Sequence, residues 1–240
     1  MTYIIIAIVG VLVGLSKGGL GAPLAVLLVP LLSMVMPVQA AIGLSLPLLM
    51  IGDAVAIVMY WRTWEMSYVK RMLLPTIIGI ILGTILLAAL PDLTLRRVLG
   101  VFTLIFIAYR LASERLKQLE YQPKPWHAYL AGWLSGVGSA LANTGAPPFL
   151  AYMLMQPITP LTLVGTTTLY FTLVNLIKLP WMLMAGMIDF QEAMASLWVI
   201  PIIIGAVFVG RWIVKRINQR VFEYILLAAL FLAAMMLLFG

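Results

Sequence analysis

The sequence predicts an all-α polytopic membrane protein built from two related halves with inverted topology. Hydrophobic residues make up 64% of the 240 residues and charged residues only 10%, whereas soluble domains are about half apolar and a quarter charged. Apolar runs long enough to cross a bilayer recur along the chain. Landmarks of the first half return in the same order in the second half. Each of these observations is developed below.

Composition also limits the function. The chain has no cysteine and a single histidine, which excludes thiol chemistry and leaves few ligands for a metal site. We therefore expect no cofactor, no metal and no enzymatic activity. The net charge of +7 lies mostly in short connections, without a basic patch interleaved with aromatic residues, so we expect no nucleic-acid partner. The first apolar run lacks a basic leader and a cleavage site, which indicates a retained helix.

Ten apolar runs divide into long and short ones. Six are long enough to span a hydrocarbon core of about 30 Å alone. These six are 38–60, 70–90, 95–112, 160–186, 191–210 and 221–239. The other four form two broken pairs, 2–16 with 22–36 and 127–142 with 146–156. A glycine-containing break interrupts each pair, at residues 17–21 in the first and 143–145 in the second.

The two halves align through an ordered series of landmarks. The tripeptide Gly21-Ala22-Pro23 corresponds to Gly145-Ala146-Pro147. Further pairs follow in order: Pro37 with Pro160, Gly43 with Gly165, Asp53 with Asn175, Glu65 with Asp189, and Gly79 with Gly205. We expect a first transmembrane repeat over residues 1–112, a cytoplasmic linker over 113–125 and a second transmembrane repeat over 126–240.

The relative orientation of the halves follows from the basic residues in the connections. If each broken pair enters and leaves on one side, 61–71, 110–126 and 211–220 all become cytoplasmic. They then carry eleven Lys and Arg against two in 91–97. If each pair crosses once, 110–126 and 211–220 fall on opposite sides. We therefore expect an inverted repeat, each half having one re-entrant pair and three full spans, with eight plain spans as the alternative.

The two breaks form the candidate substrate site. Broken helices at membrane depth are tolerated where they line a cavity, and in secondary transporters their N-termini direct N–H groups at anions. Proline suits a first helical turn, and glycine allows close approach of a ligand. The candidate substrate-binding residues at the breaks are Lys17, Gly18, Gly19, Gly21, Ala22, Asn143, Thr144, Gly145 and Ala146. The alternative is that glycine and proline only kink the helices or pack them closely.

Three further candidates lie within the long apolar runs, where a charged group is costly unless it is paired or binds a ligand. Lys178 follows Asn175 by about one turn, so the two could supply donors from one helix face, with snorkelling of the lysine as the alternative. Asp53 is the only acid deep in an apolar run. It could carry a coupling proton or pair with a lysine in one state, with a structural ion pair or a polar contact between the repeats as the alternative. Ser16, Ser45, Thr166 and Thr167 are weaker candidates.

These motifs carry a resemblance to a known family. The run from Gly14 to Pro30, its counterpart from Gly136 to Pro148, and the stretches 165–168 and 175–180 are the residues that carry it. The sequence resembles the sulfite exporter TauE/SafE family, also called the 4-toluene sulfonate uptake permease family, over essentially its whole length. The resemblance implies a multi-pass secondary transporter for sulfite, organosulfonates or related sulfur anions in the bacterial cytoplasmic (inner) membrane.

The expected function is therefore alternating-access transport of a small sulfur-containing anion, with proton coupling as an option. A passive anion channel and an accessory membrane subunit are the alternatives. The absence of a P-loop motif argues against an ATP-driven pump acting alone. The expected partners are the anion, protons and the lipid bilayer. Import and export, and a monomer and a homodimer, are all compatible with the sequence.

Overall fold

The computed structural model of the chain describes residues 2–116, 124–213 and 219–239. Every regular element in these ranges is a helix. The first half contains α1 (Thr2–Leu15), the π-helical turn η1 (Ser16–Leu20), α2 (Ala22–Val26), α3 (Leu28–Leu32), α4 (Val38–Met59), α5 (Met66–Ala89) and α6 (Asp92–Leu116). The second half contains α7 (Pro125–Ala142), α8 (Ala146–Met153), α9 (Pro160–Met184), α10 (Phe190–Ala195), the 3₁₀ turn η2 (Leu197–Val199), α11 (Ile200–Ile213) and α12 (Gln219–Phe239).

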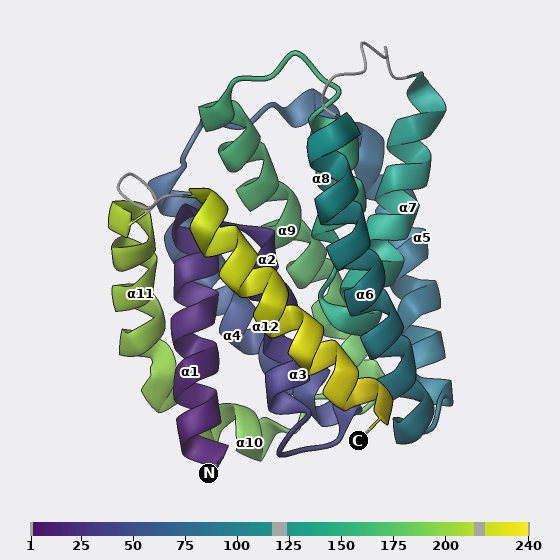
Figure 1. Cartoon of the computed structure of the whole chain (residues 1–240), viewed down its shortest axis with the longest axis vertical. Coiled ribbons are helices and arrows are strands. Elements are labelled where there is room, and N and C mark those ends of the chain that lie inside the picture. Colours follow the sequence, from purple (N-terminus) through teal and green to yellow (C-terminus); the bar gives the residue numbers. More distant parts are fainter. Residues whose placement is uncertain (1, 117–123, 214–218, 240) are drawn as a thin grey trace.

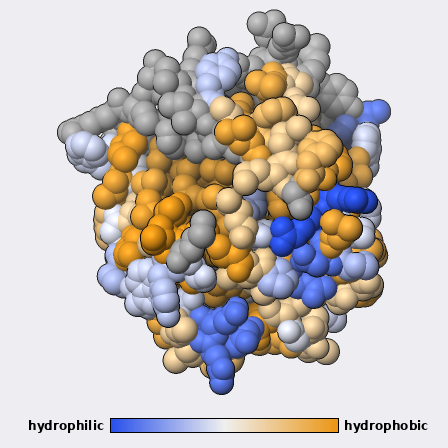
Figure 2. Space-filling view, turned by 60° about the horizontal axis from the view of Figure 1, so that its bottom comes forward, coloured by the Kyte–Doolittle hydropathy of each residue, from blue (hydrophilic) through white to orange (hydrophobic). Residues whose placement is uncertain are grey.

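Five helical segments in the described residues are long and apolar enough to cross a membrane. They are Thr2–Leu20, Val38–Met59, Met66–Ala89, Pro160–Met184 and Phe190–Ile213. Figure 2 shows a surface dominated by hydrophobic residues, with hydrophilic residues confined to small patches. Such a surface is stable in lipid rather than in water. The chain is therefore an all-helical, multi-pass membrane protein.

The lengths of these segments differ in part from the sequence-based expectation. Four of the six expected spans coincide with candidates, and α6 and α12 occupy the other two without being among the five. The first apolar run was expected to end near residue 16. The chain instead continues through Leu20 as a π-helical turn, which is kinked at Gly19 because that residue has non-helical dihedral angles. The first arm is consequently 19 residues long.

The two broken pairs occupy opposite ends of the molecule in Figure 1. The first pair starts at the N-terminus at the bottom, ascends along α1, and returns through α2 and α3 to the bottom. The second pair starts with α7 at the top, and the connection that follows α8 lies again at the top. The described part of the connections rich in Lys and Arg also lies at the top, while α10 and both termini lie at the bottom.

Helix pairing repeats when the two halves are exchanged. The alignment of the halves equates α1 with α7, α4 with α9, α5 with α11 and α6 with α12. The most extensive contacts join α1 to α11 and α5 to α7, which are equivalent pairs under this exchange. Two further contacts join α4 to α9 and α6 to α12. Exchanging the halves converts each of these contacts into itself. Each broken pair therefore packs mainly on a helix of the other half.

Glycine makes these cross-half contacts close. On the α1–α11 seam, a Cβ added at Gly14 would lie 2.9 Å from the backbone nitrogen of Val207. On the α5–α7 seam, a Cβ added at Gly79 would lie 2.9 Å from the backbone nitrogen of Val137. Small residues are the usual means of bringing helix backbones together in lipid, where no hydrophobic effect drives helix association.

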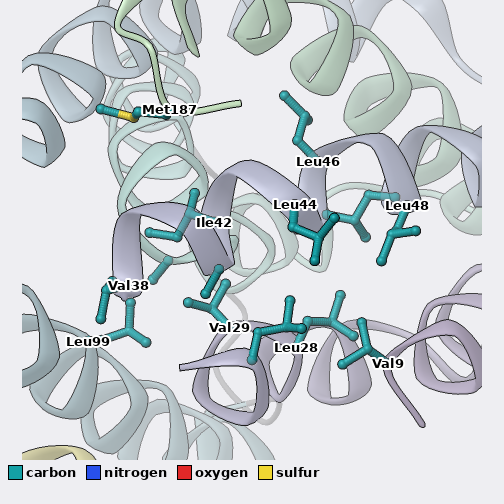
Figure 3. Packing of buried hydrophobic residues seen from close by; sticks show 14 of the residues in the cluster. Val9, Leu28, Val29, Val38, Ile42, Leu44, Leu46, Leu48, Leu99 and Met187 are labelled. Carbon is teal, nitrogen blue, oxygen red and sulfur yellow. The ribbon is translucent and has the colours of Figure 1, made fainter. Parts of the chain in front are cut away.

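An apolar cluster fills the bundle around the first half of α4, from Val38 to Leu49. Figure 3 shows Ile42, Leu44, Leu46 and Leu48 of α4 among side chains of α1, α3, α6 and the loop after α9. These residues belong to the largest buried hydrophobic cluster. Leu49, the last α4 residue in it, also faces the cavity described next. The cluster therefore forms the floor of the candidate site.

Candidate functional site

The first break reverses the chain through two glycines. Gly19 has φ 124° and Gly21 has φ 84°, values that side chains with a Cβ rarely adopt. Ser16 closes the reversal, since its Oγ donates to the carbonyl oxygen of Gly21 at 3.0 Å and its carbonyl accepts from the Gly21 N–H at 3.2 Å. The predicted interruption at residues 17–21 is confirmed, with helix α2 starting directly after it.

The second break is built differently. Helix α7 ends at Asn143, which has left-handed geometry with φ 53°; Asn tolerates this conformation better than most residues. The Thr144 N–H donates to the Gly138 carbonyl at 3.0 Å, and Ser135 Oγ donates to the Gly145 carbonyl at 2.7 Å. The first bond satisfies a carbonyl near the end of α7, and the second ties α7 to the residue that precedes α8. The predicted interruption at 143–145 is confirmed as well.

An ion pair joins the first break to helix α4. Lys17 Nζ lies 2.5 Å from Asp53 Oδ1, and its aliphatic stem passes over Gly52, where a Cβ would lie 3.0 Å from Lys17 Cγ. The second carboxylate oxygen, Asp53 Oδ2, accepts from Asn175 Nδ2 of α9 at 2.6 Å. Asp53 and Asn175, which the sequence comparison of the two halves aligns, therefore meet where α4 contacts α9.

Lys178 ties the second break to helix α9. Its Nζ donates to Asn143 Oδ1 at 2.6 Å and to the Ser139 carbonyl at 2.9 Å. Asn143 in turn donates through Nδ2 to Ser45 Oγ of α4 at 2.7 Å. The Lys178 residue is 0% exposed. Within the described part of the chain, no carboxylate lies within ion-pair distance of it, so its recorded partners are neutral oxygens.

A cavity of about 180 Å³ lies between the two breaks and helices α4 and α9. One part of its wall is polar and contains a cation, and the other part is apolar. The polar lining consists of Ser16, Lys17, Ser139, Asn143, Thr167, Thr168 and Asn175. The apolar lining consists of Ala25, Leu49, Ala146, Leu150, Val164 and Phe171, with Gly19 and Gly21 completing the wall.

The cavity brings together six of the eleven predicted substrate-binding residues: Lys17, Gly19, Gly21, Asn143, Ala146 and Asn175. Gly18 instead packs on Gly210 of α11. Thr144 lines a separate apolar groove between α6, α7 and α8, and Gly145 packs on Ser135. Ala22 is the first residue of α2. Lys178 lies behind the wall, in contact with two of its members.

Sequence reasoning missed part of the lining. Ser139, Thr168 and Phe171 were not singled out, although each has a helical relation to a residue that was. Ser139 precedes Asn143 by four residues, and Phe171 and Thr168 precede Asn175 by four and seven. Residues with these spacings share a helix face. Extending the face of each polar candidate by one or two turns would have found them.

The N-termini of the two return helices carry fewer donors than their position suggests. Proline has no backbone N–H. Helix α8 begins Ala146-Pro147-Pro148, so two of its first three positions lack this donor, and Pro23 removes one from α2. Side chains therefore provide most of the hydrogen-bonding capacity of the cavity wall. Binding of an anion by the helix ends remains a prediction.

Comparison with known proteins agrees with this architecture. The family model described as Sulfite exporter TauE/SafE matches residues 6–237 of the 240. A search of curated proteins and a search of solved structures returned no match. The family match spans nearly the whole chain, including both breaks and the cavity between them. The protein therefore belongs to the sulfite exporter TauE/SafE family of membrane transporters.

Proposed function

We propose that the protein is a secondary active transporter that moves a small sulfur-containing anion by alternating access. One observation carries the proposal: a lysine, Lys17, lines a cavity deep in the bundle at the point where both breaks meet. An ammonium group buried among apolar helices is costly unless it is paired or binds a ligand. The amides of Asn143 and Asn175 also lie in the wall, and an amide N–H₂ is a donor suited to an oxyanion.

The charge balance of the site favours an anion over a cation. Among the described residues, Lys17 is the one charged side chain of the lining, and its carboxylate partner Asp53 lies outside the lining. A cation entering the cavity would meet Lys17 directly, whereas an anion would be attracted to it. Asp53 is also held on both carboxylate oxygens, by Lys17 and by Asn175. It is therefore poorly placed to coordinate a cation.

The shape of the cavity suits an organosulfonate or a similarly small oxyanion. Its volume of about 180 Å³ is below the roughly 300–1,000 Å³ of cavities that hold drug-sized ligands. An oxyanion group would lie against Lys17, Asn143 and Asn175. The organic part of a sulfonate would then contact Leu150 and Phe171 on the apolar wall. Sulfite would fill only the polar side.

We propose that both broken pairs are re-entrant and that the halves form an inverted repeat in a bacterial inner membrane. The exchange symmetry of the helix contacts and the opposite positions of the two pairs in Figure 1 support this arrangement. Reporter tags inserted at 33–37 and at 154–159 are expected on opposite faces of the membrane, with 154–159 on the cytoplasmic face. Tags on the same face would contradict the inverted repeat.

The cavity in this state would be open toward the cytoplasm. Its α9 lining comes from the part of the helix that begins at Pro160, at the basic end of the molecule. Beyond Leu49, toward the opposite end of the molecule, the lining is followed by the buried apolar cluster. Alternating access would require this cluster to open while the cytoplasmic side closes. In an inverted repeat the two halves can exchange their conformations, and this exchange closes one side of the site and opens the other.

Asp53 is proposed as the proton-coupling residue. A proton on its carboxylate would remove the countercharge of Lys17 and release the ammonium for the anion. The Asp53→Asn variant imitates the protonated form, so its anion affinity should rise at least about tenfold, because a carboxylate that competes for Lys17 is removed. Its transport rate at a saturating anion concentration should also lose its dependence on pH. Transport by Asp53→Asn with an unchanged pH profile would rule out this role.

Exchange in liposomes tests the transporter against the channel. Purified protein is reconstituted in vesicles loaded with unlabelled sulfite, thiosulfate, taurine or sulfoacetate, and uptake of the same labelled anion is measured. A transporter is expected to show faster uptake when unlabelled anion is present inside. A channel would show uptake without this stimulation. The absence of both binding and uptake for every anion would contradict the proposed substrate class.

A further inference from the structure

Lys178 is a buried amine with no carboxylate within ion-pair distance in the described part of the chain. Its Nζ donates to the Asn143 side-chain oxygen and to the Ser139 carbonyl, and the residue is 0% exposed. The charged groups of the same site are Lys17 of η1 and Asp53 of α4, and Asp53 accepts a hydrogen bond from Asn175, one turn before Lys178. These two form an ion pair with each other. Lys178 is therefore left without a net negative neighbour.

A negative charge that balances Lys178 would come from an anion bound in the cavity. Both partners of Lys178, Ser139 and Asn143, line the cavity. An anion held there would be separated from the ammonium by one side chain. Opposite charges at that separation in a protein interior interact strongly enough to change an equilibrium by on the order of 100-fold. A bound anion would therefore stabilise the protonated form of Lys178 substantially.

We propose that Lys178 takes up a proton when the anion binds and returns it when the anion leaves. In the empty site Lys178 is a neutral amine, and the Lys17–Asp53 pair has no net charge. In the loaded site the ammonium of Lys178 balances a monovalent anion, so the site is neutral in both states. This inference rests on the proposed function, and it assigns the proton of the binding step to Lys178. Asp53 would act in the later step that opens its contact with Lys17.

The number of protons in the empty and loaded states determines whether anion affinity rises or falls with pH. The proton comes from solvent and joins the Nζ lone pair of Lys178, and no other bond changes. Because the loaded protein holds one more proton than the empty one, anion affinity falls as the pH rises. The slope approaches tenfold per pH unit where the empty site is neutral. Binding to a site with a permanently charged lysine would show no such slope.

Proton uptake on binding tests the inference directly. Thiosulfate and methanesulfonate are suitable probes because neither titrates in the range used. Each is added to purified protein in weakly buffered solution at about pH 8, and the pH change is read with an indicator dye. The wild-type protein should take up close to one proton per methanesulfonate bound. Binding without proton uptake would overturn the inference and leave the proposed function intact, whereas failure of both probes to bind would contradict that function.

Three variants identify the group that takes the proton. Lys178→Arg carries a permanent charge, so it should bind the anion without proton uptake and without a pH slope. Lys178→Met should also lose proton uptake, with anion affinity reduced at least tenfold. Asp53→Asn should keep the uptake of about one proton, because Asp53 is not the acceptor in this step. Loss of uptake in Asp53→Asn, or retention of it in Lys178→Arg, would show that the proton belongs elsewhere.

Discussion

Replacing Lys17 with alanine is expected to abolish transport and to reduce anion affinity by at least about 100-fold. Truncating one member of a buried, hydrogen-bonded charge pair costs about 2–5 kcal/mol or more. The loss here has two parts, since the anion loses the cation that lines its cavity and Asp53 loses its counter-ion. Binding is measured by calorimetry on purified protein, and transport by uptake into reconstituted vesicles.

Stability has to be separated from function in this variant. An unpaired buried carboxylate destabilises a fold by about 3–5 kcal/mol, so Lys17→Ala alone should unfold at a lower temperature. The double variant Lys17→Ala with Asp53→Asn removes both charges and should recover most of the thermal stability without recovering transport. Lys70→Ala, at an exposed position at the start of α5, is the control and should change neither. Transport by a folded double variant would show that Lys17 is not the anion anchor.

Two glycines at equivalent positions in the halves are expected to respond in opposite ways to the same substitution. A Cβ at Gly79 would meet the backbone of α7 at Val137 N, 2.9 Å away, and the Trp133 carbonyl even closer. Because backbone cannot move aside cheaply, Gly79→Ala should lower the unfolding free energy by about 1–3 kcal/mol. Thermal unfolding in detergent, followed by tryptophan fluorescence, measures the change.

Gly205 provides the matched control. It is exposed on α11, and no atom lies within 4 Å of an added Cβ. Gly205→Ala should therefore be neutral or stabilise the protein by up to about 1 kcal/mol, since alanine favours helix more than glycine. Equal losses of stability in the two variants would mean that the α5–α7 contact is not as close as described.

The position of both breaks could be predicted from the sequence because glycine and proline mark helix ends locally. Gly19 and Gly21 adopt positive φ, which is a property of the residue itself. The extent of the first arm could not be predicted in the same way. A π-helical turn kinked at Gly19 follows α1 at Ser16–Leu20, and the sequence Ser-Lys-Gly-Gly-Leu predicts an interruption rather than a π-turn.

The candidate residues could be predicted more easily than their contacts. An acid and two lysines inside apolar runs are identifiable because burying a charged group in a membrane is energetically costly. Their partners depend on how the helices are rotated, and helices that are apolar on every side show no periodicity from which rotation could be inferred. The alignment equated Asp53 with Asn175, but their 2.6 Å hydrogen bond required the crossing of α4 and α9. The sequence also predicts Lys178 as a member of the site. The structure places it behind the cavity wall, in contact with Ser139 and Asn143.

The cross-half seams bear on how the chain is assembled. Since α1 packs along α11 and α7 packs along α5, each half completes the other, and neither presents a finished surface by itself. Both seams are formed by residues within these four helices. Two separately translated polypeptides, divided between Leu116 and Lys124, should consequently find each other in the bilayer and rebuild the same bundle.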